Sequence, residues 1–225
     1  MPDRVPFRLL GYAVSNYVNI VHAVLLEKGA RFALVPTRAS QEEAFLAQNP
    51  MGKIPVLETP EGPLAETVAI IEYLEEALDG PALLPAAPYA RAKARQAINI
   101  VQVYVEVPTR SLFPGTFFGQ SNSPATIDAA RVTLDRGAKA LKRLAAPRPF
   151  LLGDALTLAD LFAFYCLDIA ERVSGFVYDR SFLDEAGLRG WFDMMAKRES
   201  SQIVLAAFDA VFLPYLVDKN AAYRP

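Results

Sequence analysis

The sequence is poor in the residues that build crosslinks and most zinc sites. It has 225 residues but only one cysteine, Cys166, and one histidine, His22. A single cysteine cannot form an internal disulfide, so nothing here favours an oxidising compartment. A histidine without a second histidine or a neighbouring cysteine gives neither a zinc site nor a catalytic triad. We therefore expect no bound metal, and we expect both residues to be structural.

An excess of charge of either sign is also missing. The chain has 23 basic and 25 acidic side chains, which gives a formal net charge of −2. Because nucleic-acid affinity rests mainly on clustered lysine and arginine, we expect no nucleic-acid partner. With 52% hydrophobic and 21% charged residues, the composition is that of a globular protein with a buried core. The length suits two domains.

Long apolar runs are absent as well. Residues 1–14 include charged side chains and lack the long apolar core of a signal peptide. No apolar run reaches the roughly 18 to 20 residues that a membrane span requires. The sequence therefore predicts a soluble, cytoplasmic protein that does not bind membranes.

The first third of the chain alternates β-favouring runs with amphipathic stretches. Residues 7–14 are typical of a strand, and Ser15 and Asn16 after them are residues that cap helices. The other predicted elements are a helix at 17–28, a strand at 31–35, a short helix that starts from a Ser40–Glu43 capping box, hairpin strands at 54–58 and 63–65, and a helix at 66–78. The predicted order is therefore βαβαββα.

Beyond residue 79 the strand pattern stops. Residues 80–88 contain three prolines and little charge, which is typical of an extended linker. The remaining periodicity is helical, and it includes a single helix expected at 182–198. Thr157 and Asp160 are spaced as a capping box at the start of an apolar helix. We predict an α/β domain at 1–79, a linker at 80–88 and an all-helical domain at 89–225.

Three stretches together resemble one known family. They are NPMGKIPVL at 49–57, ETVAIIEYL at 66–74 and the capped helix that begins at Thr157. In this order, separated by a hairpin and a proline-bearing linker, they resemble the soluble glutathione transferases over nearly the whole chain. The resemblance implies a thioredoxin-like domain that binds glutathione, followed by an all-helical domain that contributes the electrophile pocket. It also implies a homodimer.

The resemblance carries over to a set of glutathione-binding residues. Pro55 is expected to be a cis proline, and the backbone of Ile54 is expected to pair with the cysteinyl part of glutathione by strand addition. Glu66 and Thr67, at the entry to a helix, are expected to hold the γ-glutamyl end. Lys53 matches a position that often helps to bind the glycyl carboxylate, and a solvated surface lysine is the alternative.

Residues near the end of the first strand are candidates for activating the thiol. Ser15 resembles the hydroxyl residue of the serine-using classes, where it donates a hydrogen bond to the thiolate. Tyr12 is the second choice, because the tyrosine-using classes place their donor near the same strand end. The residue after the serine is often proline in the family, and here it is Asn16, which could cap the helix or donate a hydrogen bond. We expect Ser15 to be the donor.

In relatives, the second substrate lies between the first strand–helix loop and the long helices of the second domain. An aromatic wall suits apolar electrophiles, but helical cores use aromatic residues as freely. The candidates here are Tyr104, Arg110, Phe113 and Phe117, with Phe118, Phe208 and Tyr215, and Arg110 could orient an anionic substrate.

The predicted function is conjugation of glutathione to a small hydrophobic electrophile, a detoxification reaction. Two alternatives stay open. One is a glutathione-dependent isomerase, dehalogenase or peroxidase on the same scaffold. The other is a non-catalytic binding or regulatory module, since some members of the family have lost transferase activity.

Overall fold

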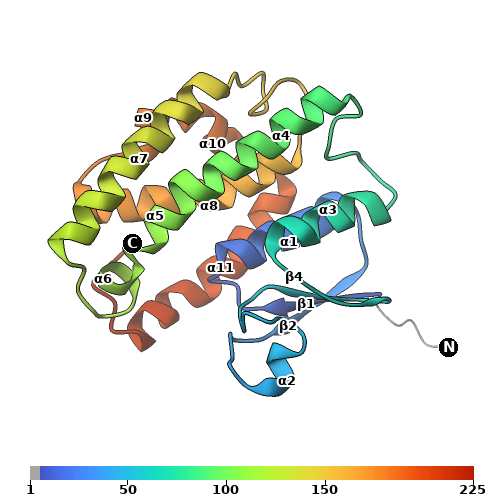
Figure 1. Cartoon of the computed structure of the whole chain (residues 1–225), viewed down its shortest axis with the longest axis horizontal. Coiled ribbons are helices and arrows are strands. Elements are labelled where there is room, and N and C mark those ends of the chain that lie inside the picture. Colours follow the sequence, from blue (N-terminus) through green and yellow to red (C-terminus); the bar gives the residue numbers. More distant parts are fainter. Residues whose placement is uncertain (1–5) are drawn as a thin grey trace. The chain divides into compact units, whose positions relative to one another are not determined.

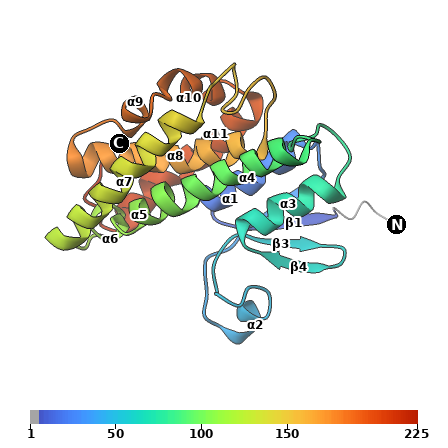
Figure 2. The same ribbon diagram turned by 45° about the horizontal axis from the view of Figure 1, so that its top comes forward.

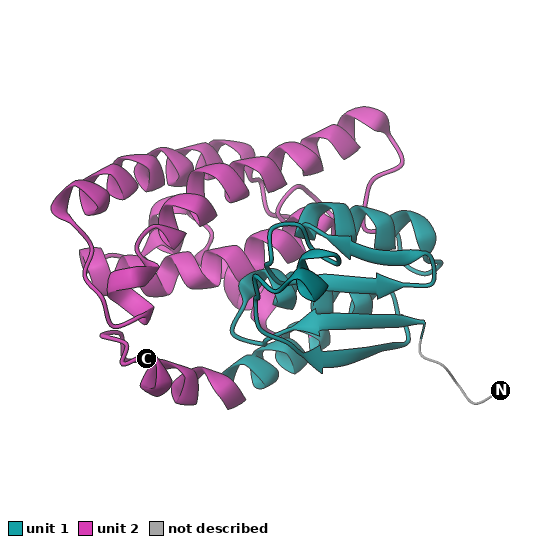
Figure 3. Cartoon of the chain, turned by 60° about the horizontal axis from the view of Figure 1, so that its bottom comes forward, with its two compact units in different colours: residues 1–82, 199–209 teal, residues 83–198, 210–225 magenta. Residues whose placement is uncertain are grey.

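A computed structural model of the chain describes residues 6–225, and these residues divide into two compact units. Unit 1 comprises the described residues up to Ala82 together with Glu199–Asp209, and unit 2 comprises Leu83–Arg198 and Ala210–Pro225 (Figure 3). The last helix of the chain thus supplies residues to both units. The domain boundaries expected from the sequence stay a prediction, because compactness alone does not define a folding unit.

Unit 1 contains a four-stranded mixed sheet and its helices. The elements are β1 (Phe7–Gly11), α1 (Asn16–Glu27), β2 (Phe32–Pro36), α2 (Glu43–Leu46), β3 (Val56–Thr59), β4 (Gly62–Ala65) and α3 (Thr67–Ala77). The strand order is β2-β1-β3-β4, with β1 parallel to β2 and antiparallel to β3, and β3 antiparallel to β4. Figure 2 shows α1 and α3 on one side of the sheet and α2 on the other. The predicted βαβαββα order is confirmed.

The apolar core of unit 1 lies between the sheet and its two long helices. Leu9 pairs with Leu57 across β1 and β3, and both side chains are fully buried. α3 adds Ile70, Ile71 and Leu74 at helical spacing, and these side chains are also fully buried. Burial of each such side chain contributes roughly 1.5 to 3 kcal/mol, so this face holds the sheet to its helices.

Unit 2 is all-helical, as predicted, and helix α8 (Leu158–Tyr178) forms its centre. The other helices are α4 (Pro88–Val101), the π-helical segment η1 (Gln102–Glu106), α5 (Val107–Arg110), α6 (Phe113–Phe117), α7 (Pro124–Leu144), α9 (Phe182–Ala186), α10 (Arg189–Ala196) and the unit 2 part of α11 (Glu199–Asp218). α8 contacts α4, η1, α5, α6 and α9, and Figure 1 shows α4 running alongside it. Its side chains Phe162, Phe164 and Leu167 are fully buried. The predicted fold class is therefore confirmed.

A buried carboxylate organises the start of α8. Asp160 accepts hydrogen bonds from the backbone N–H of Leu151 at 2.6 Å and of Thr157 at 2.9 Å. It also accepts from the Thr157 hydroxyl at 2.9 Å and from the indole N–H of Trp191 at 3.0 Å. Burial raises the pKa of Asp160, and the hydrogen bonds offset part of that rise. The carboxylate therefore caps α8 as predicted. It also joins α8 to the preceding loop through Leu151 and to α10 through Trp191, two contacts that the capping box did not predict.

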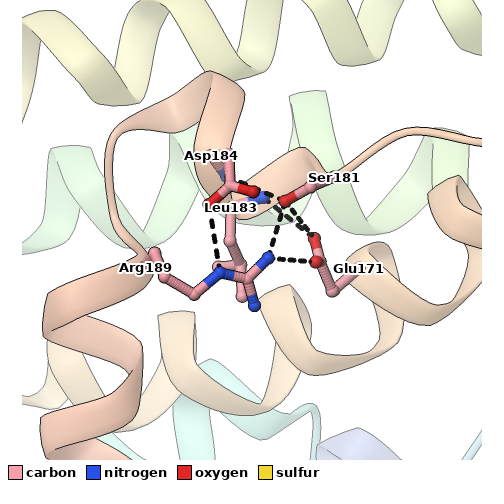
Figure 4. Close-up of polar contacts among 5 residues, drawn as sticks. All are labelled: Glu171, Ser181, Leu183, Asp184 and Arg189. Atoms are coloured by element: carbon pink, nitrogen blue, oxygen red, sulfur yellow. Dashed lines mark hydrogen bonds and ion pairs between the residues drawn. The ribbon is translucent and has the colours of Figure 1, made fainter.

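A surface ion-pair network fixes the break between α9 and α10 (Figure 4). Arg189, at the start of α10, pairs with Glu171 of α8 and, through Nε at 3.0 Å, with Asp184 of α9. The Glu171 carboxylate also accepts from the backbone N–H of Leu183 at 2.9 Å. The single helix predicted at 182–198 is therefore wrong: α9 ends at Gly187, whose φ of 69° no helix continues.

The capping box predicted at Ser40 is wrong as well. The Ser40 hydroxyl accepts from the backbone N–H of Glu42 at 3.1 Å, and α2 begins only at Glu43, with no side chain capping it. A serine hydroxyl can close a local turn as readily as it caps a helix, and here the turn is formed.

Helix α11 has an unusual composition. By length and composition, it is the one helix among residues 6–225 that could cross a membrane, with a mean hydropathy of 1.6 and one third (33%) of that stretch buried. A core helix of a soluble protein meets the same criterion, so this is weak evidence for a membrane segment. The expectation of no membrane binding stays a prediction.

The burial of His22 in α1 predicts a pH dependence of stability. His22 is 6% exposed, its ring packs edge-on against Phe32 with centroids 5.4 Å apart, and burial lowers its pKa from 6.5 to about 4. Between these two values the unfolded chain binds the proton and the folded chain does not. Stability from the neutral ring is therefore complete above pH 6.5 and is lost as the pH falls through 4.

We predict that the free energy of unfolding falls between pH 7 and pH 4 in the wild type and in His22→Gln. The decrease should be larger in the wild type, by up to about 3 kcal/mol. Denaturant titrations of both proteins at the two pH values measure the difference. Equal losses in the two proteins would contradict the prediction.

Candidate active site

Three strand ends meet on one rung of the sheet in unit 1. Leu10, next to the end of β1, pairs with Val56 at the start of β3, and Val56 pairs with Ala65 at the end of β4. The residues just outside these ends therefore share one edge of the sheet. They are the β1–α1 loop at 12–15, the pair at 54–55 and the start of α3 at 66–67, which are the segments that the sequence singled out.

The β1–α1 turn is compact because of Gly11. A Cβ on Gly11 would lie 2.4 Å from Cγ2 of Val18, so only glycine lets the strand end this close to α1. The next turn is closed by the backbone N–H of Ser15, which donates to the carbonyl oxygen of Tyr12 at 2.9 Å. These contacts fix where the first helix begins and place Ser15 as its N-cap residue.

The Ser15 hydroxyl is half-buried and is well placed to donate. Its oxygen accepts from the backbone N–H of Val18 at 3.4 Å, which is a long and weak bond. In the part of the chain that the structure describes, no hydrogen bond uses this hydroxyl as the donor. A negatively charged acceptor at this edge could therefore receive its proton without breaking an existing bond.

Tyr12, the second candidate, is already engaged. The guanidinium carbon of Arg38 lies 4.9 Å from the centroid of its ring. Arg38 is held nearby because the N–H of Thr37 donates to the carbonyl of Gly11 at 2.9 Å, which extends the β1–β2 ladder by one bond. Asn16, the third candidate, is 4% exposed and takes part in a contact of its own. Arg38 lies in no recognisable sequence motif and was not among the predicted site residues.

The peptide bond between Ile54 and Pro55 is cis, as predicted. Among the described residues, no hydrogen bond involves the backbone N–H or carbonyl of Ile54, so both groups can pair with an extended ligand. The loop before it is held by Asn49, 2% exposed, whose side chain donates to the carbonyl of Lys53 at 2.7 Å and accepts from the N–H of Met51 at 2.9 Å. Asn49 was not among the site residues predicted from the sequence, although it begins the stretch at 49–57.

The start of α3 presents unsatisfied amides beside this pair. Its N-cap residue, Glu66, makes no side-chain capping bond, and the first turn carries no acidic side chain. The first amide that closes the helix belongs to Ile70, which donates to the Glu66 carbonyl at 2.9 Å. The amides of 67–69 and the positive end of the helix dipole therefore favour a carboxylate here. Thr67 is 6% exposed, and Lys53 is an exposed side chain.

The candidates in unit 2 do not form one cluster. Phe113 and Phe117 are 9% and 4% exposed and pack together, with centroids 5.1 Å apart, inside an aromatic group that includes Phe212 and Tyr223. Tyr104 instead lines a separate surface pocket of about 490 Å³ with residues of α4 and η1. Arg110 is exposed and lies over the ring of Phe113, 4.9 Å from its centroid.

No group of described residues could hold a metal ion. The residues at the edge offer hydrogen bonding by a hydroxyl, backbone pairing and anion binding by helix amides. That set suits a peptide-like ligand that carries a carboxylate and a reactive anion.

Comparison with known proteins agrees with this arrangement of a thioredoxin-like unit and a helical unit. The family models for the glutathione S-transferase N-terminal and C-terminal domains match residues 9–82 and 124–193. A glutathione S-transferase of Pseudomonas putida is 41% identical over 176 residues, 78% of this chain and 80% of that one. The chain belongs to the glutathione S-transferase family of enzymes.

Two other known proteins are also similar to this chain. The crystal structure of a glutathione S-transferase from Methylobacterium radiotolerans, in complex with glutathione sulfonate, has a TM-score of 0.75 and 24% identity, and covers 88% of this chain and 93% of that one. A probable elongation factor 1-gamma of Arabidopsis thaliana is 36% identical over 144 residues, 61% of this chain and 33% of that one.

The backbone of Glu66 predicts an unusual order of stabilities. Its φ of 65° with ψ of 113° is a strained conformation for a residue with a Cβ. We predict that Glu66→Gly is more stable than Glu66→Ala by about 1 kcal/mol, because glycine adopts positive φ without a steric penalty. Denaturant midpoints of the two variants measure this order.

The matched control is Lys139, an exposed residue in the middle of α7. There the order should be reversed, with alanine more stable than glycine by about 1 kcal/mol, because glycine is a poor helix former. If the alanine variant were more stable than the glycine variant at position 66 as well, the backbone of Glu66 would not be strained.

Proposed function

We propose that this protein conjugates the thiolate of glutathione to a small hydrophobic electrophile. The proposal is carried by one observation: a hydroxyl, an unpaired stretch of backbone and a set of helix amides meet at one edge of the sheet. The residues concerned are Ser15, Ile54 and Thr67. The family membership and the glutathione sulfonate held by a solved structure of the same fold support the choice of ligand.

Each part of the edge suits a part of the tripeptide. The backbone of Ile54 pairs with the cysteinyl residue as an added strand, and Pro55 holds that backbone in place. The amides at the start of α3 and the hydroxyl of Thr67 hold the γ-glutamyl carboxylate, and Glu66 belongs to the same subsite. Lys53 is exposed next to Ile54 and pairs with the glycyl carboxylate.

Ser15 activates the thiol by stabilising its anion. A free thiol has a pKa of about 8.5, so only a few per cent is thiolate at pH 7. A hydrogen bond to a charged acceptor contributes roughly 1.5 to 3 kcal/mol, which lowers a pKa by about one to two units. The hydroxyl donates and does not need to act as a base. The Ser15 hydroxyl has no competing acceptor in the described chain, whereas the ring of Tyr12 lies under Arg38, which supports Ser15 as the donor.

The helical unit supplies the surface for the electrophile. Of the residues predicted for this role, Tyr104 is 49% exposed and Arg110 is exposed, whereas Phe113 and Phe117 are mostly buried and support the others. Phe118 is 38% exposed and extends the aromatic surface beyond Phe113.

A homodimer is part of the proposal. Large apolar side chains are exposed on α4, on η1, at the start of α5 and on α7, and burial against a second copy removes such a surface from water. They are Tyr89, Val103, Val107 and Val132, with exposures between 49% and 80%. A cytoplasmic location and a role in detoxification complete the proposal as predicted from the sequence.

A second candidate function is a non-catalytic module that binds a partner. The similarity to part of a probable elongation factor 1-gamma favours it, because that protein is named as an elongation factor and not as a transferase. A glutathione-dependent isomerase, dehalogenase or peroxidase remains an alternative that uses the same thiolate.

Retention on immobilised glutathione, followed by a conjugation assay with 1-chloro-2,4-dinitrobenzene, tests the proposal. We expect retention that free glutathione reverses, and turnover above the uncatalysed rate. Absence of retention would overturn glutathione binding. Retention without turnover of this and other electrophiles would favour the non-catalytic module.

The thiolate donor is tested by Ser15→Ala beside Tyr12→Phe. We predict that Ser15→Ala lowers kcat about 10- to 100-fold, because one hydrogen bond to the thiolate is lost, and that retention on glutathione persists. Titration of the thiolate absorbance of bound glutathione should show a pKa higher by about one to two units. If Tyr12→Phe alone abolished turnover, the assignment would pass to Tyr12.

A further inference from the structure

A buried carboxylate lies where the long helix of unit 2 changes its winding. The π-helical segment η1 ends at Glu106, whose side chain is 3% exposed. Burial of a carboxylate is costly unless it is paired and hydrogen-bonded. Short π-helical segments inside α-helices occur frequently at functional sites, where they redirect a side chain. This segment and its carboxylate therefore call for a functional explanation.

Glu106 forms an ion pair with Arg110, one turn further along. Both Nε, at 2.7 Å, and Nη2 of Arg110 donate to the same Glu106 oxygen. The side chain of Arg110 is nevertheless 44% exposed. A guanidinium has five N–H donors in a fixed plane, so an anion in solvent can approach one that is held at its other edge.

Aromatic rings complete the surface around this guanidinium. The guanidinium carbon lies over the ring of Phe113, 4.9 Å from its centroid, in a cation–π contact that helps to hold the group in place. Phe118, 38% exposed, meets Phe113 edge-on with centroids 6.1 Å apart. The exposed guanidinium of Arg110 and the partly exposed ring of Phe118 thus both contact the same buried ring.

We propose that Arg110 gives the enzyme a preference for aromatic electrophiles that carry a carboxylate. The aromatic ring of such a substrate packs on Phe118 while its carboxylate receives N–H donors from Arg110. Because Glu106 and Phe113 already hold the guanidinium, little conformational entropy is lost when the anion binds. The inference rests on the proposed function and names the substrate class of the same reaction.

The reaction with an aromatic chloride separates the reacting atoms from the carboxylate that Arg110 binds. The thiolate sulfur of glutathione forms a C–S bond to the ring carbon that carries chlorine. The C–Cl bond then breaks and chloride leaves with the bonding electrons, while the thiol proton goes to solvent. Arg110 contacts the carboxylate and not the reacting atoms, so it acts on specificity and not on the chemical step.

The test compares two substrates that share a ring and a leaving group, 4-chloro-3,5-dinitrobenzoate and 4-chloro-3,5-dinitrobenzotrifluoride. The measured quantity is the ratio of kcat/KM for the anionic compound to kcat/KM for the neutral one. Intrinsic reactivity cancels when this ratio is compared between proteins. We expect Arg110→Gln to lower the ratio at least about tenfold, mostly through KM for the benzoate.

Three further variants make the result specific. Arg110→Lys keeps the charge but loses the planar fork, so its ratio should lie between those of wild type and Arg110→Gln. Arg136→Gln removes an exposed arginine from α7 and should leave the ratio within about twofold of wild type. Because Arg110→Gln removes an ion-pair partner of the buried Glu106, the double variant Glu106→Gln/Arg110→Gln is measured too and should show the same lowered ratio.

The outcomes separate this inference from the proposed function. A ratio within about twofold of wild type in both Arg110→Gln and the double variant, with the neutral compound still conjugated, would overturn the inference alone. If the wild type conjugated neither compound and was not retained on glutathione, the proposed function would fail and the inference with it.

Discussion

The rung of the sheet formed by Leu10, Val56 and Ala65 is the constraint on which the candidate active site depends. Each of these residues borders a different part of the site. Leu10 lies before the loop that carries the Ser15 hydroxyl, Val56 follows the unpaired backbone of Ile54, and Ala65 lies before the start of α3. A shift of one residue in the pairing would move one segment about 3.3 Å along the strand and turn its side chains to the other face. The buried leucines beneath the sheet oppose that shift, so the core sets the geometry of the site.

The elements of the fold were largely predictable because local rules and tertiary packing agree in them. Strand, helix and turn signals in the first third gave the observed order, and Thr157 and Asp160 marked the start of the central helix. The predictions failed where the same residue type can occupy two different local structures. The hydroxyl of Ser40 closes a turn instead of capping α2, and Gly187 breaks a stretch whose periodicity alone favours one helix.

The candidate site was predictable from the sequence only in part. The motif around Ile54 and Pro55 and the helix entry at Thr67 are short and contiguous, and the structure brings them together at one edge with Ser15. Asn49 holds the loop before Ile54, and Arg38 packs on the ring of Tyr12. Both contacts depend on how the loops pack, so no sequence pattern predicts them.

In unit 2 the sequence identified aromatic and arginine residues as candidates for the electrophile surface, but it did not show which of them are exposed. An aromatic residue has the same periodicity whether it faces the core or solvent, so the burial of Phe113 and Phe117 needed the structure. The pairing of Glu106 with Arg110 follows the ordinary four-residue spacing of a helix. What the spacing could not give was the burial of the carboxylate, and this burial makes the arginine a fixed feature of the surface.

The hydrogen bond between Trp191 and Asp160 has a practical consequence. Trp191 is the only tryptophan in the sequence, and it is 4% exposed next to a buried carboxylate at the start of α8. Its fluorescence therefore reports on the packing of α8 and α10 and on nothing in the sheet. Circular dichroism averages over the backbone of the whole chain. A difference between the two signals during unfolding would show directly whether the helical unit loses its structure together with the sheet and its candidate site or independently of them.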